Sequence, residues 1–126
     1  MDTINVNELS DQERYEYLLN SISENSELWL LQARPGLFAM FEDKNGQEYI
    51  PVWPNEDYAS KYSEDDWNDY QAEPMGMAEL YEWVNELKED EILIAAFPNN
   101  KSQAIPLDPI EFGKHVREHR KGLSQK

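Results

Sequence analysis

The stretch YIPVWP, Tyr49 to Pro54, places a valine and a tryptophan between two prolines in a polar, acidic chain. Pro51 has no amide proton, so a strand tolerates it only where the strand has an unpaired side or a bulge. YIPVW is therefore predicted to be an edge strand or the frayed end of one. Pro54 ends the ladder and has a φ angle suited to opening a helix, which predicts a short helix in PNEDYASKY, residues 54–62. Trp53 is expected to be a core anchor at this corner.

Before this stretch, the sequence predicts a helix and two strands. Ser10 and Glu13 form a capping box, and the helix face that follows is apolar at i, i+3, i+4 and i+7: Tyr15, Leu18, Leu19 and Ile22. ELWLLQA (27–33) is typical of a buried strand. Asn45-Gly46 favours a tight hairpin, so LFAMFED (37–43) and QEYIPVW (47–53) should pair antiparallel. These three strands are predicted to form a meander.

After this stretch, MAELYEWVNELKEDE (77–91) predicts a second clear helix. Its expected buried face consists of Met77, Leu80, Tyr81, Val84 and Leu87, with Trp83 off that face. ILIAAF (92–97) is predicted to be a central strand, joined by a turn at residues 99–101 to its partner SQAIPL (102–107). Asp108 should cap a last helix that contains Pro109 in its first turn. The sequence thus predicts one α+β domain over residues 1–126, with a core of about residues 8–120. We expect a mainly antiparallel sheet of about five strands, with about four helices packed on it.

The charge of the chain limits its partners. It has 11 basic and 26 acidic residues, for a formal charge of -15, which repels nucleic-acid phosphates and anionic membranes and favours a basic protein partner. The exception is residues 111–126, where five residues are basic and two acidic. Cysteine is absent, the N-terminus lacks a signal-peptide pattern, and the longest apolar run, residues 92–97, is too short to cross a bilayer. A cytoplasmic protein is expected.

The order of these motifs resembles the bacterial family catalogued as domain of unknown function 2750. The resemblance extends over roughly residues 14–116 and lies in RYEYLL, LWLL, IPVWP and ILIAAFPN. Its main residues are Arg14, Tyr15, Trp29, Leu30, Leu31, Pro51, Val52, Trp53, Pro54, Phe97 and Pro98. It implies a small bacterial protein that is a single domain, and it brings no catalytic residues. We expect no cofactor.

One motif has the form of a zinc site. HVREH, residues 115–119, matches the H-x-x-E-H pattern, in which two histidines one helical turn apart bind zinc and the glutamate is a general base. Such an enzyme needs a further ligand downstream, and seven residues follow His119. His115 and His119 are therefore only weak metal candidates, and the alternative is that they are cations near a helix C-terminus, where they interact with the helix dipole.

A second candidate site mixes aromatic and acidic residues. The segment SEDDWNDYQAEP (63–74) has no glycine or final glutamate in the positions that a calcium loop requires. Its aromatic side chains would anchor a basic protein surface and its carboxylates would speed the encounter. The predicted binding residues are Asp65, Asp66, Trp67, Asp69 and Tyr70, extended by Trp83. The alternative is a solvated acidic loop.

Three functions remain open at this point. The sequence favours a non-catalytic protein-binding module, of an immunity or regulatory type, that masks a basic region of its partner. A small metal-dependent hydrolase would use the scattered carboxylates or the two histidines. An orphan structural domain would have no tight ligand.

Overall fold

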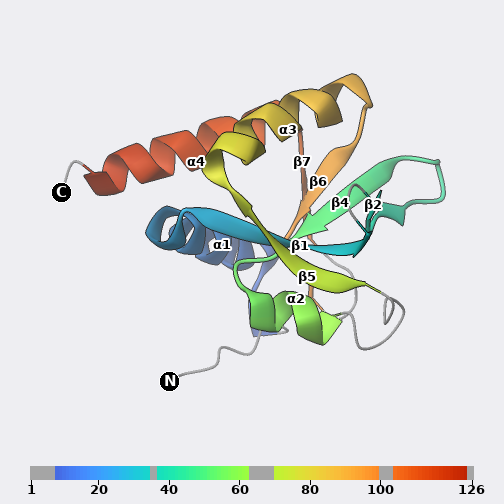
Figure 1. The fold of residues 1–126 in the computed structure, drawn as a ribbon, viewed down its shortest axis with the longest axis horizontal. Coiled ribbons are helices and arrows are strands. Elements are labelled where there is room, and N and C mark those ends of the chain that lie inside the picture. The colour runs from blue at the N-terminus through green and yellow to red at the C-terminus, as the bar shows by residue number, and fades with distance from the viewer. Residues whose placement is uncertain (1–7, 35–36, 63–69, 100–103, 125–126) are drawn as a thin grey trace.

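The computed structural model describes residues 8–34, 37–62, 70–99 and 104–124 (Figure 1). In chain order the elements are α1 (Asp11–Asn25), β1 (Glu27–Arg34), β2 (Leu37–Phe38), β3 (Phe41–Glu42), β4 (Glu48–Val52), α2 (Glu56–Tyr62), β5 (Gln71–Gly76), α3 (Met77–Glu89), β6 (Leu93–Ala96), β7 (Ile105–Leu107) and α4 (Pro109–Ser124). The described residues therefore form an α+β fold with four helices, as predicted. Figure 1 shows α3 and α4 together on one side of the strands, with α2 on the other.

The strands of the described residues form two sheets, so the prediction of a single sheet of about five strands is wrong. One sheet has the order β2-β1-β5 and the other β3-β4-β6-β7. The predicted meander is divided because the segment LFAMFED contains two short strands, one in each sheet. β2 pairs with β1, and β3 pairs with β4. All pairings are antiparallel except that of β4 with β6. An isolated bridge between Trp29 and Trp53 joins the two sheets.

Strand β5 was not predicted, because its segment was interpreted as an acidic loop. It pairs with β1 over six residues, from Gln71 opposite Gln32 to Gly76 opposite Glu27. Its sequence, QAEPMG, lacks β-branched residues and contains a proline and a glycine, and Met75 is its only buried side chain. The strand forms because β1 provides a long edge for it, and such tertiary context overrides weak β propensity.

Each of three strands contains one proline, and each proline turns its nitrogen to a side where the described residues offer no strand partner. Phe97 N–H donates to Val52 C=O, so the backbone groups of Val52 face β6. Neighbouring residues in a strand face opposite sides, so the nitrogen of Pro51 faces away from β6. On that side it lies between the residues of β4 that pair with β3 and the Trp53 bridge. By the same alternation, the nitrogen of Pro74 faces away from β1, and the nitrogen of Pro106 faces away from β6. The structure confirms the prediction of a locally unpaired side at Pro51, but β4 is an interior strand rather than an edge strand, because β3 and β1 pair with it before and after the proline.

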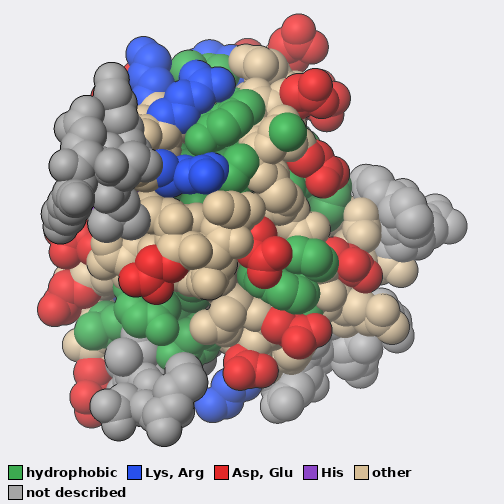
Figure 2. Space-filling view, turned by 60° about the vertical axis from the view of Figure 1, so that its left-hand side comes forward, with side chains coloured by type: hydrophobic (Ala, Val, Ile, Leu, Met, Phe, Trp, Pro, Cys, Tyr) green, Lys and Arg blue, Asp and Glu red, His purple; other side chains and the backbone are tan. Residues whose placement is uncertain are grey.

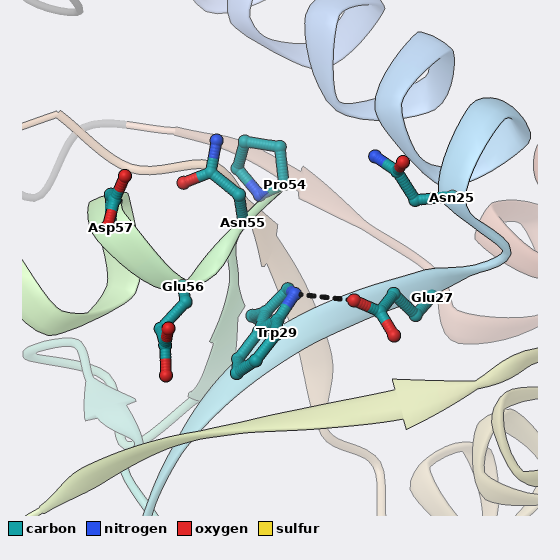
Figure 3. A pocket seen from close by; sticks show the side chains of 7 residues that line it. All are labelled: Asn25, Glu27, Trp29, Pro54, Asn55, Glu56 and Asp57. Carbon is teal, nitrogen blue, oxygen red and sulfur yellow. Dashed lines mark hydrogen bonds between the residues drawn. The ribbon is translucent and has the colours of Figure 1, made fainter.

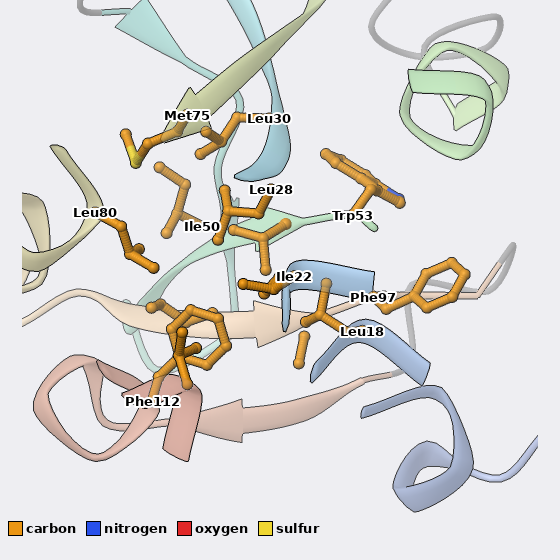
Figure 4. Packing of buried hydrophobic residues seen from close by; sticks show 14 of the residues in the cluster. Leu18, Ile22, Leu28, Leu30, Ile50, Trp53, Met75, Leu80, Phe97 and Phe112 are labelled. Atoms are coloured by element: carbon orange, nitrogen blue, oxygen red, sulfur yellow. The ribbon is translucent and has the colours of Figure 1, made fainter. Parts of the chain in front are cut away.

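The buried residues form one apolar cluster to which every helix and both sheets contribute. Figure 4 shows Leu18 and Ile22 of α1 near Leu28 of β1 and Ile50 of β4. The predicted buried face of α1 is confirmed in full. Trp53 is 1% exposed, which confirms it as a core anchor.

Side chains cap the helices where the sequence predicts it. Glu13 N–H donates to Ser10 Oγ at 3.1 Å, and Ser10 N–H donates to Glu13 Oε1 at 2.9 Å, which is the predicted capping box. Asp108 accepts the Glu111 N–H at 3.1 Å at the start of α4. In the part of the chain that the structure describes, no helix combines the length and the apolar character needed to cross a membrane.

A buried arginine ties α1 to the end of β6. Arg14 is 1% exposed, and its guanidinium donates to the backbone oxygens of Phe97 at 3.0 Å and Leu9 at 2.7 Å and contacts the Asp11 carboxylate. Phe97 has a φ of 48°, which is rare for a bulky residue. The left-handed turn takes the Phe97 carbonyl out of the β ladder, and the Arg14 guanidinium donates the hydrogen bond that this carbonyl would otherwise lack.

Candidate functional site

Most of the predicted acidic and aromatic site lies outside the described residues. This applies to Asp65, Asp66, Trp67 and Asp69. Tyr70 is described, and its half-buried side chain packs against the apolar core. It stands directly before β5, so part of its surface is used in packing.

Trp83 is not on the surface where the prediction placed it. Its side chain is 8% exposed and packs against Phe38, with ring centroids 5.9 Å apart. The buried face of α3 consists of Leu80, Trp83, Val84 and Leu87, which are spaced i, i+3, i+4 and i+7. The prediction chose Tyr81 instead, and Tyr81 is half-buried under the guanidinium of Arg117, 4.2 Å from the ring centroid. Because Trp83 is buried in the core, it does not extend a docking surface.

The two histidines of α4 face α1. His115 Nδ1 and the Tyr15 hydroxyl are hydrogen-bonded at 2.5 Å, and His119 Nδ1 and Ser23 Oγ at 3.1 Å. Burial raises the pKa of Tyr15 well above its ordinary value, which keeps its hydroxyl neutral beside the imidazole. Within the described ranges, no group of three or more His, Asp or Glu side chains is placed to hold a metal ion. The geometry thus gives both imidazoles a role in helix packing.

The structure contains an acidic cleft of about 360 Å³ where the end of α1, the start of β1 and the start of α2 meet. Its lining residues are Asn25, Glu27, Trp29, Pro54, Asn55, Glu56 and Asp57. Figure 3 shows Trp29 in the middle, with Glu27 on one side and Glu56 on the other. We call this site the Trp29 cleft. It is in the size range of pockets that take small ligands or single side chains.

Hydrogen bonds connect the walls of the Trp29 cleft. Asn25 Nδ2 donates to Ser21 Oγ at 3.2 Å, and Ser21 Oγ donates to the Pro54 carbonyl at 3.1 Å, which ties α1 to the corner before α2. Asn55 Oδ1 accepts the Tyr58 N–H at 3.0 Å and so caps α2. These bonds join protein groups to one another, so they hold Asn25 and the Pro54–Asn55 corner in fixed positions along the cleft.

The floor of the cleft is equally well fixed. The backbones of Trp29 and Trp53 exchange two hydrogen bonds, and the indole N–H of Trp29 donates to Glu27 Oε2 at 3.1 Å. Glu27 and Trp29 are two residues apart on β1, and such residues lie on the same face of a strand. The indole and a carboxylate therefore meet in a defined orientation.

The electrostatic character of the cleft is negative. Glu27, Glu56 and Asp57 bring three carboxylates, and the described lining residues include no lysine, arginine or histidine. None of the three carboxylates forms an ion pair with another described residue. A cation that enters would therefore meet carboxylates, with no basic side chain among the described residues that line the cleft.

Sequence reasoning missed this site because its parts come from three segments. ELW (27–29) was interpreted as a buried strand, although Glu27 and Trp29 are both half-buried. The available signal was an acidic residue and an aromatic residue at i and i+2 at the start of a strand. Pro54-Asn55-Glu56-Asp57 was correctly interpreted as a helix start, but the sequence alone does not show that this segment lies beside Trp29.

Comparison with known families identifies the chain. A family model described as protein of unknown function (DUF2750) matches residues 15–116. The chain belongs to the DUF2750 family. The resemblance inferred from the motifs is thereby confirmed. Neither the curated proteins nor the solved structures gave a match.

The matched region of this DUF2750 protein contains both sheets and the whole Trp29 cleft. Ser10 and Arg14 precede it, and the last turns of α4 follow it. The family description gives no activity.

Proposed function

We propose that this protein is a non-catalytic binding module that holds a basic segment of another protein against the face that contains the Trp29 cleft. The observation that carries the proposal is the cleft itself, which three carboxylates and a half-buried indole line together. Aromatic anchors next to charged groups are typical of binding hot spots. An immunity or regulatory role, in which a basic region of the partner is masked, fits this chemistry.

The charge distribution supports the same proposal. The chain carries a formal charge of -15, although its last helix is rich in lysine and arginine. Figure 2 shows most of the Lys and Arg side chains of one face gathered at its upper left, with Asp and Glu side chains at many places over the rest of it. A basic partner is therefore attracted over a wide surface and repelled mainly near α4.

The hydrolase alternative gains no observation in its favour. Its best candidates were His115 and His119, and the Nδ1 atoms of both are hydrogen-bonded to hydroxyl groups of α1. The carboxylates of the Trp29 cleft do not form a metal-binding group with other described side chains.

The test is capture of a partner from lysate of the source cells by three immobilised proteins. The first is the wild type, and the second carries Glu27→Gln, Glu56→Gln and Asp57→Asn. The third carries Glu82→Gln, Glu86→Gln and Glu89→Gln, which removes the same charge from exposed positions of α3. A basic protein that is retained by the first and third, lost from the second and released by salt supports the proposal. If no protein is retained by the wild type at low salt, the proposal is wrong.

A further inference from the structure

We infer that the Trp29 cleft is a pocket for one arginine side chain of the partner protein. This inference rests on the proposed binding function and makes it more specific: it names the side chain that is recognised and the residues that recognise it. Three features of the cleft carry it, namely the placement of carboxylates on two sides of Trp29, its aromatic floor and the hydrogen bond that orients the Trp29 indole.

The carboxylates suit a large, flat cation rather than a metal ion. Glu27 lies on one side of Trp29 and Glu56 on the other, with Asp57 beyond it on the first turn of α2 (Figure 3). In the described part of the chain, these three do not form a group close enough to hold a metal. A guanidinium has five N–H donors spread over a plane, so it can reach acceptors on both sides at once.

Trp29 adds a surface on which a guanidinium can lie. Arginine stacks on aromatic rings more often than lysine does, and tryptophan gives the strongest cation–π attraction. The same chemistry occurs inside this protein, where the Arg117 guanidinium lies 4.2 Å above the Tyr81 ring centre. At Trp29, the described residues that line the cleft provide no such cation.

The hydrogen bond from the Trp29 indole to Glu27 fixes the orientation of these two side chains in the pocket. Because the N–H of Trp29 donates to Glu27 Oε2, the carboxylate is held beside the ring and keeps its other oxygen as an acceptor. Glu27 and Trp29 therefore have little conformational freedom left to lose on binding, and such pre-organisation favours affinity. Lysine, a compact point charge with a strong hydration shell, gains less from this extended arrangement.

The inference is tested with three synthetic peptides that differ in one residue. They are acetyl-Gly-Gly-Xaa-Gly-Gly-amide with arginine, with citrulline, which has the same shape without the charge, or with lysine. Each is titrated into the full-length, 15N-labelled protein, and the Trp29 indole N–H cross-peak, assigned from the spectrum of a Trp29→Phe variant, is followed by NMR. The arginine peptide should shift this cross-peak in a saturable manner. The citrulline and lysine peptides should bind about tenfold more weakly or worse.

Protein variants complete the test. Glu56→Gln with Asp57→Asn should weaken the arginine peptide about tenfold, whereas Glu86→Gln with Glu89→Gln should leave its affinity nearly unchanged. Glu27→Gln keeps an acceptor for the indole N–H, so it removes charge without freeing Trp29 and should also weaken binding. Equal binding of arginine and lysine peptides, equal loss in the control variant, or no shift at Trp29 overturns the inference.

Failure of the arginine pocket can be told apart from failure of the binding function. If lysate capture gives a basic partner that the cleft variant retains as well as the wild type does, the protein binds through another surface and only the pocket is wrong. If no partner is captured, the binding function itself fails.

Discussion

The backbones of Trp29 and Trp53 are hydrogen-bonded to each other in both directions, with N···O distances of 2.9 and 2.8 Å. This bridge joins the two sheets, since Trp29 belongs to β1 and Trp53 directly follows β4. The two indoles have separate surroundings: Trp53 is in the core, and Trp29 lines the acidic cleft. We thus assign the structural role to Trp53 and the binding role to its neighbour Trp29.

This division predicts opposite outcomes for the two alanine substitutions. Trp53→Ala should lower the free energy of unfolding by about 3–5 kcal/mol, because it leaves a large cavity in the core. Trp29→Ala should cost less than about 2 kcal/mol, because its side chain is only half-buried, yet it should abolish capture of the basic partner. Urea denaturation and the capture experiment measure the two effects. Equal losses of stability would contradict the assignment.

Two glycines should respond in opposite directions to replacement by alanine. Gly113 lies inside α4, and an added Cβ would meet Val84 at an ordinary contact distance of 3.5 Å. Gly113→Ala should therefore raise the free energy of unfolding by about 0.5–1 kcal/mol through helix propensity. Gly46 has a φ of 85° in the hairpin turn, which a residue with a Cβ adopts only with strain. Gly46→Ala should therefore lower the free energy of unfolding by about 1–2 kcal/mol. Denaturant midpoints test both changes, and loss of stability in Gly113→Ala would show that α3 and α4 do not tolerate the methyl group.

Pro74 should protect the outer edge of β5 from pairing with another chain. Trp29 directs its backbone groups to Trp53, so the opposite residue, Pro74, turns its nitrogen away from β1. Pro74→Thr restores an outward N–H and should increase self-association, measured by sedimentation velocity. Gln71→Thr is the control, because the N–H of residue 71 already faces β1. Self-association that rises equally in both variants would contradict the role of Pro74.

Asp43 should make stability depend on pH in acid. Backbone N–H groups of Gln47 and Asn45 and the hydroxyl of Tyr49 hold the pKa of Asp43 below its ordinary value. A lowered pKa in the folded state means that the ionised carboxylate stabilises the fold above the unfolded pKa, about 3.9, and that this contribution is lost as the pH falls through the folded value. Asp43→Asn should therefore be less stable than the wild type at pH 7, and the difference should shrink below about pH 4. Urea midpoints over this pH range provide the measurement, and a difference that stays constant would contradict it.

The features that the sequence predicted correctly are those set by local physics. Ser10 with Glu13 and Asp108 with Glu111 form caps within three residues, and the apolar spacing of α1 specifies its buried face. The prolines correctly indicated an unpaired side at Pro51. Each of these depends on neighbours in the chain.

The features that the sequence did not show depend on which distant segment becomes a neighbour. β5 is polar and forms because β1 offers it an edge, and LFAMFED changes sheets at Ala39-Met40 for the same kind of reason. Trp83 is buried because β2 brings Phe38 over α3. The Trp29 cleft was missed for the same reason, since Glu27 on one wall and Glu56 on the other are separated in the chain by β2, β3 and β4.

The affinity of the captured basic partner should be measured at a series of salt concentrations. This measurement compares the wild type, the variant with Glu27→Gln, Glu56→Gln and Asp57→Asn, and the α3 control. We predict that the wild type and the control bind tightly at low salt and weaken steeply as salt rises, and that the cleft variant binds weakly with a shallower salt dependence. A cleft variant whose affinity and salt dependence match those of the wild type would contradict the account.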